Sequence, residues 1–210
     1  MEDRNKLYTW QTLTLVVGGL IVNYAGAKIA LLCKLPIFLD SVGTVLAAAY
    51  GGFLPGVTVG FFSNVLNSVG DPITLYYGVI SMLIGILAAV FSQKRFFLTV
   101  PRTLATVIPF ALVGGAVGSV LTWMLSGLSF GSGISSPFVL SIYHALGVSE
   151  FTAQLIGDFL IDLLDKLVTV AIVYPVLHLM PQAWVANLPL GHLYLKKPAE
   201  TPAETEAPKD

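Results

Sequence analysis

The sequence predicts an all-α polytopic membrane protein, a bundle of six transmembrane helices. Its 210 residues are 55% hydrophobic and only 11% charged, and its mean hydropathy is +0.81. Soluble domains carry about 25% charged residues, so a surface this poor in charge suits lipid better than water. The hydrophobic residues also fall in long runs, as membrane-spanning helices require.

Charge and motif content argue against several functional classes. The net charge is −1, and no basic cluster indicates a nucleic-acid partner. Cys33 is the only cysteine, which excludes an internal disulfide and a cysteine-based zinc site, and the three histidines lack metal-ligand spacing. The chain has no HExxH motif, phosphate-binding loop or nucleophile elbow. We therefore expect no enzyme, with no catalytic residues, metal or cofactor.

Six apolar segments meet or approach the length of about 20 residues that a membrane span needs. They are Leu7–Cys33, Leu39–Phe53, Gly56–Val69, Thr74–Ser92, Leu104–Leu125 and Phe151–Met180. The second and third are short, so we expect them to be tilted, extended into their flanks or partly re-entrant. A signal peptide cleaved near Ala25-Gly26-Ala27 is the alternative for the first segment, but its apolar run continues to Cys33 and favours an uncleaved span.

Turn-forming residues separate the segments. Lys34-Leu35-Pro36, Gly51–Gly56 and Gly70-Asp71-Pro72 make the first three breaks. The connection from Ser126 to Glu150 is longer and rich in Gly and Ser, and its length fits a lid over a binding site and a plain surface loop equally well. We expect residues 1–196 to form the transmembrane domain and residues 197–210, with a Pro-Ala-Glu-Thr tandem, to form a disordered tail.

Basic residues predict the orientation of the bundle. They gather in three connections that share one side of a six-helix chain: before the first helix, between the fourth and fifth, and after the sixth. These residues are Arg4, Lys6, Lys94, Arg95, Arg102, Lys196 and Lys197. The positive-inside rule therefore predicts a multi-pass protein of the cell (plasma) membrane with both termini in the cytoplasm.

The last segment carries charges that are costly inside a membrane. Gln154, Asp158, Asp162 and Lys166 are spaced four apart and form one stripe, which Asp165 borders. The stripe either lines a ligand cavity or ion path, or it is a buried salt bridge between helices. Asp162 and Lys166 are placed to pair, whereas Asp158 has no basic neighbour within one turn. Asp158 is therefore the better candidate for ligand contact.

Other candidate ligand-binding residues lie elsewhere in the chain. Asn64 and Asn67 share one face of the third segment, and Asp71 follows at its outer end. Tyr143 and His144 lie in the long outer connection. Buried amides need hydrogen-bond partners, which either neighbouring helices or a ligand can supply.

Small residues four apart on the first segment, Gly26 and Ala30, allow close approach of another helix. Packing inside the bundle is the more common use of such a stripe, and docking of a second protein is the alternative.

The chain resembles a known family. The six-helix layout, the sixth segment with acids followed by Lys166, and one long stretch, Leu39–Phe91, carry the resemblance; that stretch reads LDSVGTVLAAAYGGFLPGVTVGFFSNVLNSVGDPITLYYGVISMLIGILAAVF. Over about residues 7 to 180 they are similar to the substrate-specific S components of energy-coupling factor (ECF) transporters. The resemblance implies a protein that binds a vitamin or similar micronutrient from outside and works with a transmembrane coupling subunit and two cytoplasmic ATPases. It also implies a docking face at Gly26 and Ala30.

Two alternatives stay open. Related six-helix modules serve as membrane domains of sensor proteins, so a ligand-sensing or regulatory module without transport is one. An ion-coupled carrier that uses the acids of the sixth segment is the other, although the sequence lacks the internal repeats of many such carriers. In every case the expected partners are a small-molecule ligand and the lipid bilayer.

Overall fold

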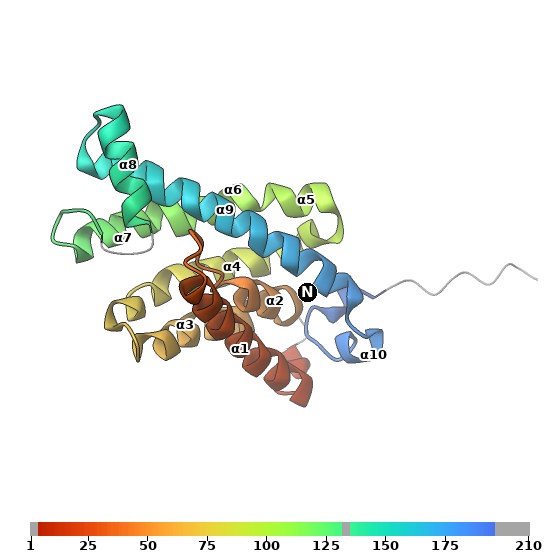
Figure 1. The fold of residues 1–210 in the computed structure, drawn as a ribbon. Helices are drawn as coiled ribbons and strands as arrows, with labels where there is room; N and C mark the ends of the chain where they lie inside the picture. Colours follow the sequence, from red (N-terminus) through yellow and green to blue (C-terminus); the bar gives the residue numbers. More distant parts are fainter. Residues whose placement is uncertain (1–3, 132–134, 196–210) are drawn as a thin grey trace, which may run out of the picture.

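The computed structural model describes residues 4–131 and 135–195, and every regular element in that part of the chain is helical (Figure 1). The α-helices are α1 (Trp10–Leu32), α2 (Val42–Gly51), α3 (Phe53–Ser68), α4 (Gly78–Gln93), α5 (Val100–Ala105), α6 (Val107–Ala111), α7 (Gly118–Leu125), α8 (Ser136–Leu146), α9 (Glu150–Leu179) and α10 (Gln182–Val185). Short 3₁₀ turns are η1 (Arg4–Lys6), η2 (Pro72–Leu75), η3 (Phe96–Leu98) and η5 (Gly191–Leu193), and η4 (Leu112–Val117) is a π-helical turn. The predicted disordered tail, residues 197–210, lies outside the described residues.

Three helical stretches are long and apolar enough to cross a membrane: Trp10–Leu32, Pro72–Gln93 and Val100–Leu125. They correspond to the first, fourth and fifth predicted spans, so the membrane class predicted from composition is supported. The helices α2 and α3 have 10 and 16 residues. At 1.5 Å per residue they measure about 15 and 24 Å, less than the roughly 30 Å of a hydrocarbon core. The helix α9, with 30 residues, is long enough but carries the acidic stripe.

The helices form two halves that meet along α9. In Figure 1 the helices α1 to α4, red to yellow, lie on one side, and α5 to α9, green to blue, lie on the other. The long helix α9 packs against η4, α6 and α8 of its own half and against α2 of the first half, while α4 contacts η4. The site described below lies where these two halves face each other.

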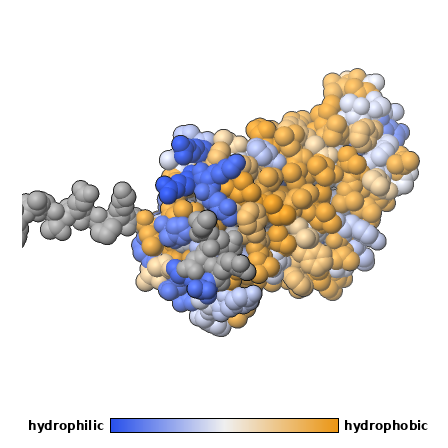
Figure 2. All heavy atoms as spheres, turned by 180° about the vertical axis from the view of Figure 1, so that it is seen from behind, coloured by the Kyte–Doolittle hydropathy of each residue, from blue (hydrophilic) through white to orange (hydrophobic). Residues whose placement is uncertain are grey.

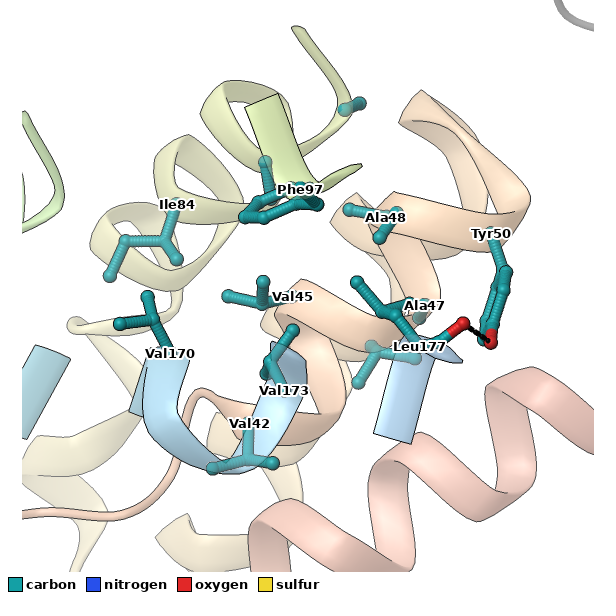
Figure 3. Close-up of a cluster of buried hydrophobic side chains, with 14 of the residues drawn as sticks. Val42, Val45, Ala47, Ala48, Tyr50, Ile84, Phe97, Val170, Val173 and Leu177 are labelled. Carbon is teal, nitrogen blue, oxygen red and sulfur yellow. Dashed lines mark hydrogen bonds between the residues drawn. The ribbon is translucent and has the colours of Figure 1, made fainter. Parts of the chain in front are cut away.

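A hydrophobic core joins α2 to α9 (Figure 3). The view shows Val42 and Val45 of α2 facing Val170 and Val173 of α9. Ile84 of α4 and Phe97 of η3 belong to the same cluster. At its edge the Tyr50 hydroxyl donates to the Leu177 carbonyl oxygen at 2.9 Å. This packing fixes the position of α9, and with it the position of the acidic stripe.

Polar and small residues hold the first three helices together. A Cβ on Gly43 would overlap the backbone of Gly19, so α1 and α2 approach as closely as two glycines allow. The fully buried Asn23 donates from Nδ2 to Thr44 Oγ1 at 2.8 Å and to Ser63 Oγ at 3.0 Å. Its Oδ1 accepts from the Gly43 N–H at 2.6 Å. One side chain thereby connects α1, α2 and α3.

The small residues of α1 pack within the chain, which is the more common use expected of such a stripe. Ala30 is fully buried, and a Cβ on Gly26 would overlap the Leu39 carbonyl. The long connection, expected to be a loop, contains the eleven-residue helix α8 (Ser136–Leu146). Pro137 lies in the first turn of this helix. Gly147, whose φ of +61° suits glycine, follows its last residue.

The surface is divided into zones (Figure 2). A broad hydrophobic band covers the middle of the molecule, and hydrophilic residues gather at the end where α10 lies. The segments before α1, at the end of α4 and after α10 meet at that end. Lys6 Nζ donates to the Ala186 carbonyl at 2.7 Å, and Ser92 Oγ lies 2.8 Å from the Tyr194 hydroxyl. The exposed Lys94 lies two residues after Ser92. The basic connections named in the sequence therefore come together in space where they are described.

Candidate functional site

A cavity of about 310 Å³ lies between the two halves. Its walls come from α3, α4, η4, α7 and α9, and from the connections before α2 and after α7. The polar side chains in the lining are Asp40, Asn64, Asp71, Thr74, Tyr77, Ser81, Thr122, Ser126, Ser135, Asp158, Asp162 and Lys166. The lining includes the exposed Asp71 as well as the buried Asp162 and Lys166.

The structure brings most of the predicted ligand residues to this cavity. Five of the eight line it: Asn64, Asp71, Asp158, Asp162 and Lys166. The other three are absent from its lining. Asn67 is half-buried on α3, and the ring of Tyr143 packs edge-on against Phe130 and His144, with centroids 5.4 and 5.3 Å away.

Lys166 is surrounded by acceptors. Its Nζ lies 2.6 Å from Asp165 Oδ2, 3.3 Å from Asp162 Oδ1 and 3.1 Å from Ser41 Oγ. The predicted pair with Asp162 is confirmed, but Asp165, expected only to border the stripe, is the closer partner. Two of the three ammonium donors form hydrogen bonds, to Asp165 and Ser41, and the contact with Asp162 is an ion pair. The charge of Lys166 is therefore already shared by two carboxylates of the chain.

Asp165 has a structural role that the sequence did not reveal. It is fully buried, and its Oδ1 accepts the backbone N–H groups of Phe38 at 2.9 Å and Leu39 at 2.7 Å. These bonds tie the segment that enters α2 to the middle of α9. The helical spacing of α9 could not predict this contact, because the partners are backbone groups of an irregular segment more than 120 residues away.

Asp158 is held by neutral donors. Its Oδ2 accepts from Ser119 Oγ at 3.0 Å and from Gln154 Nε2 at 2.6 Å. Gln154 Oε1 in turn accepts the Gly131 N–H at 3.2 Å, so the carboxylate is linked to the segment after α7. Both bonds to Asp158 end on Oδ2, which leaves Oδ1 without a hydrogen bond to the described residues. The predicted lack of a basic neighbour is confirmed, since no ion pair to Asp158 occurs in the described part of the chain.

Asp162 is incompletely satisfied. Its side chain is only 6% exposed, and Oδ2 has no hydrogen-bond partner among the described residues. This carboxylate packs against Gly114, where an added Cβ would lie 2.6 Å from the Asp162 Cγ. Gly114 belongs to the π-turn η4, and such turns inside helices often mark functional sites. Leaving a buried carboxylate oxygen unpaired is unfavourable, and such a group needs a specific explanation.

The remaining polar walls are held in place by hydrogen bonds. The Tyr77 hydroxyl and Thr122 Oγ1 are 2.7 Å apart, which joins the start of α4 to α7. Asn64 Nδ2 donates to the Gly60 carbonyl at 3.0 Å and to Ser81 Oγ at 2.8 Å. The cavity is therefore largely preformed, as is usual for small-molecule sites. Thr122 was not among the predicted ligand residues, because isolated hydroxyl residues are common in membrane helices.

The cavity lining is strongly acidic. Four carboxylates line it, Asp40, Asp71, Asp158 and Asp162, against the single ammonium of Lys166. Within the described residues, no three His, Cys, Asp or Glu side chains are grouped as a metal ion would require. The arrangement suits a small organic molecule with hydrogen-bond donors.

Comparison with protein-family models, curated proteins and solved structures finds no match to this chain.

Proposed function

We propose that this chain is the membrane-embedded substrate-binding component of an uptake system for a vitamin or similar micronutrient. The observation that carries the proposal is the preformed polar cavity of about 310 Å³ inside an apolar helix bundle. Ligand pockets range over about 300–1,000 Å³, so the volume favours a small molecule over a peptide or a lipid.

In the proposed topology the six segments correspond to α1, α2, α3, the η2–α4 unit, the α5–α7 unit and α9. The short α2 and α3 are accommodated because they pack against each other and against α1 and α4. The end with Lys6, Lys94 and Arg95 faces the cytoplasm. The cavity, whose lining extends to Asp71 and Ser126 in the connections after α3 and α7, then opens to the outside.

Transport would require partners, because the chain has no phosphate-binding loop of its own. The resemblance to ECF S components implies that these partners are a transmembrane coupling subunit and cytoplasmic ATPases. Since Ala30 and Gly26 pack within the chain, the coupling subunit would meet the exposed side of α1 instead. Val17 and Ile21 are large apolar side chains on that side.

The test is affinity purification of the full chain from its native membrane in mild detergent. The proposal expects one membrane subunit and ATPase subunits to co-purify, and ligand uptake by reconstituted vesicles to require ATP. A chain that purifies alone and moves no ligand with ATPases present would contradict the proposal and favour a sensory module.

An ion-coupled carrier is a second candidate, and the unpaired Asp162 Oδ2 favours it because carriers use such carboxylates as proton acceptors. Vesicles containing only this chain separate the two functions. Uptake that is driven by a proton gradient without ATP would establish the carrier and refute the uptake component.

A further inference from the structure

The charge of the cavity is not balanced by the chain. Asp158, Asp162 and Asp40 face a cavity whose single cation, Lys166, is already held by Asp165 at 2.6 Å. Asp165 does not line the cavity and shares that positive charge with Asp162. Asp158 has no ion pair to the described residues, and Asp162 shares Lys166 with Asp165. Poorly solvated carboxylates that outnumber their cations are unfavourable, so a compensating positive charge is expected at this place.

Two oxygens show where the missing charge belongs. Asp162 Oδ2 is buried without a hydrogen-bond partner among the described residues. One turn away on the same face of α9, Asp158 lines the cavity with an oxygen, Oδ1, that has no hydrogen bond to the described residues. The neutral donors Ser119 and Gln154 fix the orientation of Asp158 without neutralising it.

The other walls also suit a cation. The aromatic residues Phe38 and Tyr77 contribute to the lining, and aromatic faces attract ammonium groups. Among the described residues the lining contains no arginine, and its one lysine is ion-paired with Asp165 and Asp162, so an anionic ligand would find no unpaired positive charge there.

We propose that the cavity takes a ligand with a compact organic cation, an ammonium or amidinium group, which binds between Asp158 and Asp162 of α9. This inference rests on the proposed function, because it takes the cavity to be the ligand site, and it adds the chemical class of the ligand.

Three probes of the same shape test the inference: benzamidinium, the neutral benzamide and the anionic benzoate. Each is titrated into the purified full chain in detergent while the melting temperature is measured. We expect benzamidinium alone to raise the melting temperature. Asp158→Asn should weaken its apparent affinity by about tenfold or more, as for loss of a hydrogen bond to a charged group. Glu150→Gln removes the same charge from the exposed start of α9 and should bind like the unaltered chain.

Equal stabilisation by the three probes, or by none of them, would overturn the inference. So would unchanged benzamidinium binding in a folded Asp158→Asn variant, because the carboxylates would then be neutral or remote from the ligand. These outcomes leave the proposed function intact if the chain still co-purifies with ATPases, so the two proposals can fail separately.

Discussion

Replacing Lys166 with methionine should destabilise the protein strongly. Methionine matches the unbranched apolar part of the lysine side chain but lacks the ammonium. It strands two buried carboxylates, Asp165 at 2.6 Å and Asp162 at 3.3 Å from the lost ammonium. Removing one partner of a buried pair costs about 3–5 kcal/mol. For a chain of this size 1 kcal/mol shifts the melting temperature by about 2–4 °C, so a fall of about 6–20 °C is expected.

Second-site changes make this prediction specific. Asp165→Asn keeps an oxygen for the Phe38 and Leu39 N–H groups while removing the stranded charge. Added to Lys166→Met, it should restore more stability than Asp162→Asn does, because Asp165 is the closer partner of Lys166. The measurement is thermal unfolding in detergent, and Lys94→Met on the exposed surface is the matched control. If Lys166→Met melts with the control, or if Asp162→Asn is the better rescue, the assigned ion-pair geometry is wrong.

Three further predictions concern packing, the site and the topology. Asn23→Leu should lower the melting temperature in the same assay, because it removes three buried hydrogen bonds. Each partner group left unpaired costs about 1–3 kcal/mol. A loss no larger than that of Val17→Ala, on the exposed face of α1, would refute the role of Asn23 in joining the first three helices. Gly114→Ala should abolish benzamidinium binding in titrations because its Cβ displaces the Asp162 carboxylate, and normal binding would contradict the placement of η4. For the topology, single cysteines are placed in a chain whose Cys33 is replaced by serine. A membrane-impermeant thiol reagent added outside intact cells should label Gly70→Cys and not Arg95→Cys. Labelling of Arg95→Cys alone would show that the proposed topology is inverted.

The helical class and three of the apolar spans followed from composition, because lipid selects long uncharged helices regardless of their detailed packing. The pairing of Asp162 with Lys166 also followed, since residues four apart on one helix must be neighbours. Contacts between distant segments could not be predicted in this way. Asp165 binds backbone groups before α2, and α8 forms within a connection whose Gly and Ser content indicated a loop.

The residues of the candidate site also differ in whether the sequence alone could identify them. Asp158 and Asp162 were identifiable because a charge in an apolar helix stands out in the sequence. Gly114 and Thr122 were not, since glycine and threonine are frequent throughout such helices and only the fold shows which of them face the cavity. Tyr143 and His144 were expected at the site from their place in the outer connection. In the structure the Tyr143 ring packs against Phe130 and His144, and neither Tyr143 nor His144 is part of the cavity lining.

Filling the cavity tests the central claim most directly. Gly118 lines the cavity, and a Cβ built on it meets nothing within 4 Å, so Gly118→Leu should extend into the cavity without disturbing the helices. Gly18 on α1 has the same free space but lies away from the cavity, which makes Gly18→Leu the matched control. Native mass spectrometry of the chain purified from its own membranes should find a small molecule retained by the unaltered protein and by Gly18→Leu, and absent from Gly118→Leu. Equal retention by a folded Gly118→Leu variant, or no retained molecule in any of the three, would contradict a ligand site in this cavity.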